Sequence, residues 1–302
     1  MAWSWAYVST VVPEVEEAIP FFRDTLGLCD LGEGEFTGIS ARGRLLALGS
    51  NARLAVVEPV GDGVAARQLR DHRGGLCHIA VVAPDADSGH VRGGPASSPI
   101  GRSRMVSENE TSGLLLEIVD GAEGLETGNT HSVLVSELDH VATVVPDLDG
   151  ALVAFQHLRF NEDPSSSGWQ FPDLSTRNIV MPADWGYLEL NQALTSDGVF
   201  GSVAAARGAG IVGLTLTVHD LPAAVERLRE ADVGITDPAS VVARSPDGAE
   251  LDLGHSAVVS MKHAFGTRLF LFAPTAEAPY FGPKERRGAG PSEFGVRQRS
   301  TS

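Results

Sequence analysis

The chain has 302 residues and is 43% hydrophobic, a composition typical of a folded globular protein, and its length indicates about two domains. Its 39 acidic and 23 basic residues give a net charge of −16, which disfavours nucleic acid and anionic membrane surfaces as partners. No apolar stretch is long enough to span a membrane, and the N-terminus lacks the pattern of a signal peptide. Two cysteines are too few for a disulfide framework. We therefore expect a cytoplasmic protein that binds neither nucleic acid nor a membrane.

The first two of four similar segments each begin with a short apolar strand followed by a turn that contains Pro or Asp. The first strand is expected at Ala6–Val12, before an amphipathic helix over Pro13–Leu28. The second strand is expected at Leu76–Val82, before the turn at Pro84 and Asp85. Between Asp85 and Ile100 small and polar residues predict a loop or a truncated helix.

The other two segments repeat the pattern. The third runs from Leu138 to Leu148 and continues into a helix that ends near Leu158. The fourth begins with a strand from Val212, and a helix over Pro222–Ala231 follows. Asp220 is expected to cap the exposed amides of that helix, because an Asp side chain accepts hydrogen bonds from the first turn.

Each segment then closes on a further strand, expected at Arg53–Glu58, Leu114–Val119, Tyr187–Leu190 and Arg268–Phe272. A repeat of roughly 60–75 residues indicates duplicated units that bury their sheets against each other. We therefore predict an α+β fold of four βαβββ modules, paired into two half-barrel domains. Residues 1–122 hold the first pair (about 5–60 and 75–120), 123–136 a linker, 137–276 the second pair (about 137–192 and 209–275), and 277–302 a Gly, Pro and Arg-rich tail.

Two modules carry a His early in their first strand and a Glu in their last strand. The third opens Leu-Asp-His-Val around His140 and ends Tyr-Leu-Glu-Leu around Glu189. The second opens Leu-Cys-His-Ile around His78 and ends Leu-Leu-Glu-Ile around Glu117. These patterns resemble glyoxalase-like domains and methylmalonyl-CoA epimerases, and over residues 5–275 the chain resembles the vicinal oxygen chelate superfamily. The resemblance implies that His78, Glu117, His140 and Glu189 occupy metal-ligand positions.

The other two modules depart from this pattern. Tyr7 and Ala55 occupy the equivalent positions in the first module, and Gly213 and Phe270 do so in the fourth. If modules pair in chain order, each barrel holds one His and one Glu. If the second pairs with the third and the first with the fourth, one site collects all four ligands. The sequence leaves both pairings open.

Imidazole and carboxylate ligands without thiolate suit an open catalytic site for Zn²⁺, Ni²⁺, Co²⁺, Mn²⁺ or Fe²⁺. Such a metal polarises a carbonyl and stabilises the enolate that forms when a base removes the neighbouring proton. In glyoxalases and epimerases a Glu serves as this base, and the resemblance implies that Glu117 and Glu189 hold that position here. The resemblance therefore implies a glyoxalase-like lyase or isomerase acting on a small oxygenated molecule.

Two alternatives remain open. Two His and one Glu in one site would resemble the facial triad of a non-haem iron dioxygenase. Loss of ligands in half the modules would suit a metal-free, bleomycin-resistance-like binding protein, with a pocket lined by Trp169, Phe171 and Trp185.

Three further residues are candidates for contact with the substrate. Arg177 and Asn178 lie where glyoxalase-like domains often place polar residues that contact the substrate. Tyr7 either donates a hydrogen bond in a pocket or fills the degenerate position of the first module. The expected partner is a small molecule, and a homodimer is left open.

Overall fold

The computed structural model describes residues 3–49, 52–82, 94–120, 132, 134–163, 170–171, 175–184, 186–245 and 247–275. The segment between Asp85 and Ile100 is described only from residue 94, and most of the predicted linker and the whole tail lie outside the described residues. Within the described part, no helix is long and apolar enough to cross a membrane.

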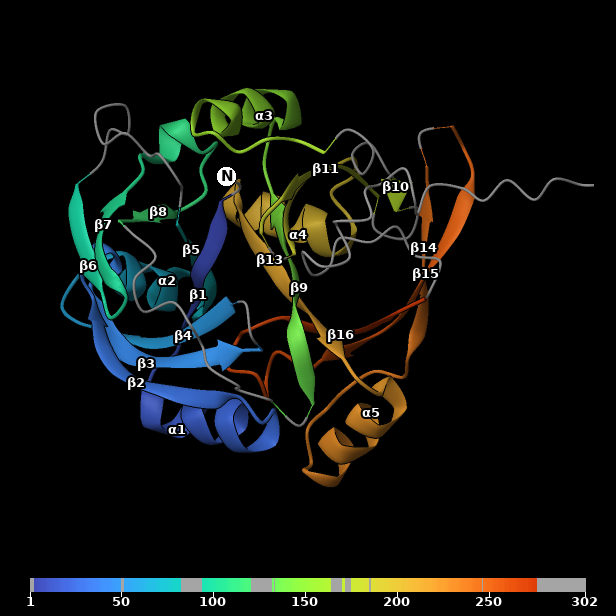
Figure 1. Cartoon of the computed structure of the whole chain (residues 1–302), viewed down its shortest axis with the longest axis horizontal. Helices are drawn as coiled ribbons and strands as arrows, with labels where there is room; N and C mark the ends of the chain where they lie inside the picture. The colour runs from blue at the N-terminus through green and yellow to red at the C-terminus, as the bar shows by residue number, and fades with distance from the viewer. Residues whose placement is uncertain are drawn as a thin grey trace, which may run out of the picture.

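The first and second modules form one eight-stranded sheet, on the left in Figure 1. Its strands are β1 (Ser4–Val11), β2 (Cys29–Phe36), β3 (Ala41–Leu48), β4 (Ala52–Pro59), β5 (Gly75–Val82), β6 (Pro95–Ser98), β7 (Gly101–Met105) and β8 (Leu116–Val119). The order across the sheet is β2-β3-β4-β1-β5-β8-β7-β6. The two modules meet where β1 pairs antiparallel with β5, and this pairing sets Ser9 opposite His78. We call this sheet the first barrel.

The third and fourth modules form a closed barrel, called the second barrel here, on the right in Figure 1. Its strands are β9 (Val135–Val144), β10 (Gln170–Phe171), β11 (Thr176–Pro182), β12 (Tyr187–Ala193), β13 (Gly210–Val218), β14 (Ala239–Arg244), β15 (Glu250–Val259) and β16 (Leu269–Pro274). The order is β10-β11-β12-β9-β13-β16-β15-β14, with β9 antiparallel to β13. The modules therefore pair in chain order, and this sheet order excludes the nested pairing.

The helices are α1 (Val15–Ile19), the π-helix η1 (Pro20–Thr25), α2 (Val64–His72), α3 (Leu148–His157), α4 (Gly198–Arg207) and α5 (Leu221–Glu230), with short 3₁₀ turns η2 (Thr37–Ile39) and η3 (Glu108–Glu110). As predicted, Asp220 caps α5, because its Oδ1 accepts a hydrogen bond from the amide of Ala223 at 3.0 Å. The first helix is shorter than predicted and passes into η1 at Pro20, a residue that lacks the amide hydrogen of a regular α-helix.

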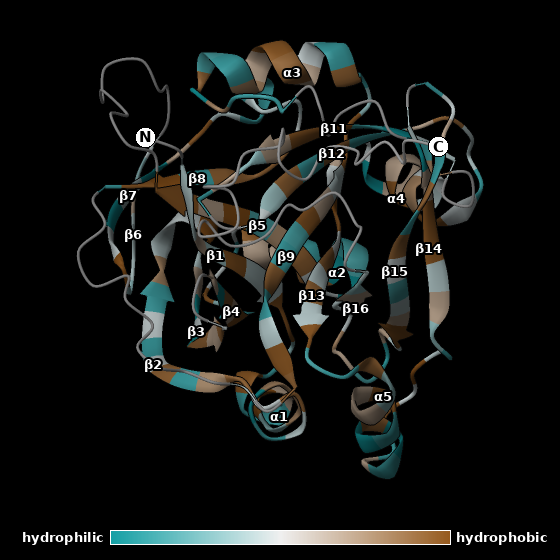
Figure 2. Cartoon of the chain, turned by 45° about the vertical axis from the view of Figure 1, so that its right-hand side comes forward, coloured by the Kyte–Doolittle hydropathy of each residue, from teal (hydrophilic) through white to brown (hydrophobic). Residues whose placement is uncertain are grey.

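One continuous apolar core joins the two barrels. Strand residues such as Ile79 of the first barrel and Leu214 of the second belong to it, together with Phe22, Phe155 and Leu228 from the helices. Figure 2 shows hydrophobic residues along the central strands and both hydrophobic and polar positions on α3 and α5. Because strand residues alternate between faces, the residues between these core positions lie on the opposite face of each sheet.

Candidate functional site

The four predicted ligands lie in two pairs, one pair in each barrel. In the first barrel β5 and β8 are parallel, and Glu117 lies opposite Ala80, two residues after His78. In the second barrel β9 and β12 are parallel, and Glu189 lies opposite Ala142, two residues after His140. Each His and its Glu therefore occupy the same face of adjacent strands. The structure does not bring the four residues together, because the modules pair in chain order.

The pair in the first barrel is completely enclosed. His78 Nε2 lies 3.1 Å from Glu117 Oε2, and the two side chains are 0% and 1% exposed. The hydroxyl of Tyr7 donates a hydrogen bond to the same Oε2 at 2.7 Å. On the other side of the imidazole, Nδ1 lies 3.1 Å from the Oγ of Ser9. Each of the two predicted ligands is thus held by a neighbour on β1.

Two atoms of this cluster lack a partner. His78 Nε2 makes no hydrogen bond of acceptable geometry within the described residues, and neither does Glu117 Oε1. Both atoms are buried, and buried polar atoms are normally paired with protein, water or an ion. His78 Nε2 and Glu117 Oε1 are therefore the atoms of this cluster that a water molecule or an ion could contact.

The surroundings of the cluster are apolar. Tyr7, Ala55, Ala80 and Phe36 belong to one hydrophobic cluster, and the rings of Tyr7 and Phe36 lie 5.3 Å apart. Burial raises the pKa of Glu117, but the neighbouring His78 imidazole, 3.1 Å away, and the Tyr7 hydroxyl bring the pKa below its usual value. Burial and the Glu117 charge hold the pKa of Tyr7 well above its usual value. The cluster therefore contains a carboxylate and a neutral phenol at neutral pH.

His140 in the second barrel has partners at both ring nitrogens. Its Nδ1 lies 2.7 Å from Asp139 Oδ2, and its Nε2 lies 2.9 Å from the Oγ1 of Thr215. Its ring stacks on Tyr187 at 4.6 Å, with 24° between the planes. Burial lowers the pKa of His140, but the hydrogen bond and charge of Asp139, with the Glu189 charge, bring it above its usual value.

Glu189 also has both oxygens occupied. Its Oε1 accepts a hydrogen bond from Asn178 Nδ2 at 2.8 Å, and its Oε2 accepts one from Asn191 Nδ2 at 3.0 Å. The amide oxygens of Asn178 and Asn191 are buried and have no partner within the described residues. The polar interior of the second barrel is thus organised around a carboxylate held by two amides.

The fourth module fills its degenerate positions with an aromatic ring. A Cβ added at Gly213 would lie 2.5 Å from the Cε2 of Phe270, so the phenyl ring lies directly over the glycine. The two positions that hold His and Glu in the third module are therefore occupied by a glycine and the ring that covers it.

Arg177 and Asn178, the other residues predicted to contact the substrate, lie on opposite faces of β11. Asn178 is buried, whereas Arg177, one residue earlier on β11, is exposed and lies 3.3 Å from Asp149 of α3. The structure does not bring Arg177 to the site, because adjacent strand residues face opposite sides of a sheet. Phe171 is half-buried, whereas Trp169 and Trp185 lie outside the described residues.

The sequence analysis missed Ser9, Asp139, Asn191 and Thr215. Two of them, Ser9 and Asn191, have a weak signal in the sequence. Ser9 lies two residues after Tyr7, and Asn191 two residues after Glu189, so each shares a strand face with a predicted residue. Asp139 and Thr215 carry no such signal, because their contacts with His140 depend on side-chain orientation and on how β9 and β13 pair.

No known protein family and no curated protein sequence matches the chain. Among solved structures it is similar to a variant of 4-hydroxymandelate synthase from Streptomyces coelicolor, with 17% identity, a TM-score of 0.65, and coverage of 97% of this chain and 98% of that one. It is also similar to a xylose isomerase-like TIM barrel/4-hydroxyphenylpyruvate dioxygenase fusion protein, with 16% identity, a TM-score of 0.60, and coverage of 96% of this chain and 51% of that one. The chain shares the fold of these two proteins, in which paired βαβββ modules form two eight-stranded sheets.

At these identities the likeness establishes the fold alone, and it confirms the predicted α+β arrangement of paired modules. The proteins with this fold are named as a synthase and a dioxygenase fusion. A methylmalonyl-CoA epimerase from Mycobacterium tuberculosis covers 49% of this chain at 25% identity, with a TM-score of 0.40 that is too low to establish a likeness.

The resemblance noted in the sequence implies a divalent metal, and the two barrels differ in how well they suit one. The described residues contain no group of three His, Cys, Asp or Glu side chains that could hold an ion. In the first barrel, however, the 3.1 Å separation of His78 Nε2 and Glu117 Oε2 suits a shared ion, since two ligand atoms about 2.1 Å from one metal and roughly at right angles lie about 3 Å apart. Ser9 and Tyr7 supply the outer hydrogen bonds that metal ligands usually have. The first barrel therefore fits a metal through two protein ligands.

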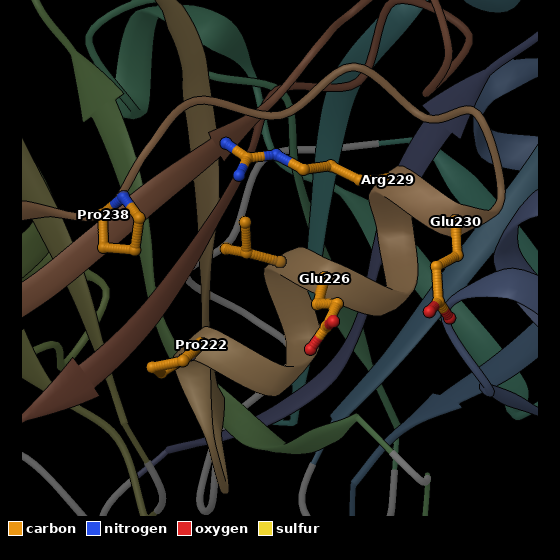
Figure 3. A pocket seen from close by; sticks show the side chains of 6 residues that line it. Pro222, Glu226, Arg229, Glu230 and Pro238 are labelled. Atoms are coloured by element: carbon orange, nitrogen blue, oxygen red, sulfur yellow. The ribbon is translucent and has the colours of Figure 1, made fainter.

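A surface groove of about 620 Å³ lies along α5, away from both barrel interiors (Figure 3). It is lined by Pro222, Glu226, Arg229, Glu230 and Pro238, together with one valine. Arg229 is already paired with Asp237 at 2.6 Å. No residue of either polar cluster lines the groove, so it is not the candidate site.

Proposed function

We propose that the chain is a metal-dependent enzyme, a glyoxalase-like lyase or isomerase that acts on a small oxygenated molecule. His78 and Glu117 hold the divalent ion (Zn²⁺, Ni²⁺, Co²⁺, Mn²⁺ or Fe²⁺) inside the first barrel. The observation that carries this proposal is the convergence of His78 Nε2 and Glu117 Oε2 at 3.1 Å in an enclosed interior, with two buried atoms unpaired.

When bound, the metal polarises the substrate carbonyl and stabilises negative charge on its oxygen. Glu117 Oε1 takes the proton from the neighbouring carbon, because it is the carboxylate oxygen without a partner in the described structure. Tyr7 holds the other oxygen, Oε2, and so orients the carboxylate. Ser9 can accept a hydrogen bond from Nδ1–H of His78, and in that tautomer Nε2 is unprotonated and would serve as the metal ligand.

Exclusion of water supports this chemistry. His78, Tyr7 and Glu117 are 0%, 0% and 1% exposed, so charges in the cluster are weakly screened. The same burial requires that side chains of the barrel interior move to admit a substrate. Closed sites that open for the substrate are common among enzymes that must exclude water from the reaction.

The oxygenase alternative is less well supported. It requires two imidazoles and one carboxylate in one site. Because the modules pair in chain order, the predicted ligands of each barrel include one imidazole, His78 in the first barrel and His140 in the second. We therefore favour lyase or isomerase chemistry over an iron dioxygenase.

Proton exchange with solvent tests the proposal. The metal-loaded protein is incubated in D₂O with dicarbonyl adducts and acyl thioesters, and loss of the proton signal next to the carbonyl is followed by NMR. We expect exchange in the wild type and a reduction of about 10²–10⁴-fold in Glu117→Gln, because the base is removed. Glu189→Gln is the matched control and keeps the activity.

Two results would overturn this assignment. Equal exchange in the wild type and in Glu117→Gln would show that Glu117 is not the base. Tight binding of the small molecules without exchange, and without any metal requirement, would favour the metal-free binding alternative.

A further inference from the structure

A cleft of about 160 Å³ lies where the two barrels meet. Leu76, at the start of β5, contributes to it from the first barrel. The second barrel contributes Arg207 at the end of α4, Val212 of β13, and Met261, Gly266 and Arg268 from the segment before β16. We call this the interdomain cleft. None of its lining residues belongs to the two polar clusters inside the barrels.

Two guanidinium groups line the interdomain cleft, and both bind neutral groups. Arg207 Nη1 donates a hydrogen bond to the carbonyl oxygen of Leu76 at 3.4 Å. Arg268 donates through Nη1 to the carbonyl oxygen of Val212 at 3.3 Å and through Nη2 to the sulfur of Met261 at 3.4 Å. Since each guanidinium has five N–H donors, both keep donors available for a ligand.

The positive charge in the cleft is not neutralised within the described residues, where neither arginine forms an ion pair. The chain has a net charge of −16, and other arginines, such as Arg229 and Arg244, do pair with carboxylates. Burial lowers the pKa of both cleft arginines, and Arg207 lowers that of Arg268 further, so the two charges repel each other. Both remain protonated at neutral pH.

Within the described residues, the hydrogen-bond partners of the two guanidinium groups are two backbone carbonyl oxygens and a thioether sulfur, and none of them carries a charge. Because two unpaired cations that repel each other cost free energy, a dianion in the cleft would relieve both.

We propose that the interdomain cleft binds a phosphate group, either as free phosphate or as the phosphate of a small monoester. Two forked guanidinium groups match the charge and geometry of a phosphate dianion better than those of a carboxylate monoanion. The volume supports a small group, because about 160 Å³ is well below the 300–1,000 Å³ typical of sites for drug-sized molecules. Both arginines belong to the second barrel, and Leu76 places the bound phosphate beside the first barrel.

Calorimetric titration with inorganic phosphate, at pH 8 and low ionic strength, tests the proposal on the intact chain. We expect saturable binding by the wild type and a loss of affinity of about 10–100-fold in Arg207→Ala and in Arg268→Ala, because each removes a charged hydrogen bond. Arg229→Ala is the matched control, since Arg229 is a paired arginine that lines the separate groove of Figure 3. We expect the Arg229→Ala variant to bind inorganic phosphate with the affinity of the wild type.

Two further measurements extend the test. Glycerol phosphate in place of inorganic phosphate distinguishes a monoester site from a free-phosphate site. Saturating phosphate also raises the melting temperature of the wild type by roughly 3–6 °C, because the ligand binds only the folded chain. If an alanine variant does not fold, Arg207→Lys and Arg268→Lys keep the charge but lose the forked donors, and they too bind phosphate more weakly.

Three outcomes would overturn the proposal. The first is the absence of phosphate binding by the wild type. The second is unchanged affinity in both cleft variants. The third is acetate binding as tight as phosphate binding at equal ionic strength, which would remove the preference for a dianion.

Discussion

The same pair of residue types has two different environments in this protein. His78 and Glu117 face each other at 3.1 Å, and each keeps an atom without a hydrogen-bond partner in the described structure. His140 and Glu189 occupy the equivalent strand positions, but Asp139, Thr215 and two asparagines bind all of their polar atoms. A ligand that enters the second pair must first displace these hydrogen bonds, at a cost of about 1 kcal/mol or more for each. A ligand that binds His78 Nε2 and Glu117 Oε1 displaces no hydrogen bond from these two atoms within the described residues.

The hydrogen bond between Asp139 and His140 gives a prediction that depends on pH. Asp139→Asn removes the charge that raises the pKa of His140, so burial dominates and the pKa falls. NMR titration of the imidazole measures this change directly. Because the folded pKa of His140 is raised, its contribution to stability is fully present below the unfolded value of about 6.5 and is lost as pH rises through the folded pKa.

The loss of stability in Asp139→Asn is therefore largest near pH 5.5–6 and smaller at pH 8, as measured by urea unfolding at each pH. An unchanged His140 pKa in the variant, or a loss of stability that grows with pH, would contradict this account.

At the scale of secondary-structure elements, strands were the most predictable feature, because each module has a buried apolar strand at its start and another at its end. The predicted strand over Tyr187–Leu190 lies within β12, and the predicted cap at Asp220 is present. The helix α2 (Val64–His72) was not predicted, because Arg and Gln interrupt its apolar face and no Ser, Thr, Asp or Asn precedes it as a cap. Gly63 occupies that position instead.

Helix capping gives a matched pair of variants. Asp220→Ala removes the hydrogen bond to the amide of Ala223 and lowers the free energy of unfolding by about 0.5–2 kcal/mol. Asp147 occupies the same position before α3 but makes no capping hydrogen bond, so Asp147→Ala has a smaller effect. Urea denaturation of the two variants measures the difference. An equal loss in both would show that the cap of α5 contributes no specific stabilisation.

At the scale of the whole molecule, the sequence could not decide how the modules pair. Both pairings satisfy the same strand patterns, and the choice depends on contacts between distant residues, such as the register that sets Ser9 opposite His78. The positions of the ligand residues on the strands could be predicted, because they recur within repeated modules. Their division between two barrels could not be predicted, because it follows from that pairing.

The close contact between the barrels predicts that they unfold together. Gly75 has φ +84°, and a Cβ added there would lie 2.5 Å from the carbonyl oxygen of Gly266. Gly75→Ala therefore lowers the free energy of unfolding by about 1–2 kcal/mol because of the left-handed conformation. The close contact between the barrels lowers it by roughly a further 1–3 kcal/mol. Gly61 has φ +71°, and a Cβ added there would meet no atom within 4 Å. Gly61→Ala therefore loses only the contribution of the left-handed conformation.

Unfolding in urea, followed by tryptophan fluorescence and by circular dichroism, measures both variants. We expect one transition for both signals, because the apolar core is continuous between the barrels. Two separate transitions, or equal losses in Gly75→Ala and Gly61→Ala, would show that the barrels are energetically independent.

The metal content of the purified chain tests the central claim most directly. Mass spectrometry is applied to the wild type, to His78→Ala and to His140→Ala as the matched control, each after incubation with Zn²⁺, Ni²⁺, Co²⁺, Mn²⁺ or Fe²⁺. The account predicts about one divalent ion per chain in the wild type and in His140→Ala, and its loss in His78→Ala. No bound metal in the wild type, or an ion that is lost in His140→Ala but kept in His78→Ala, would contradict a metal centre in the first barrel.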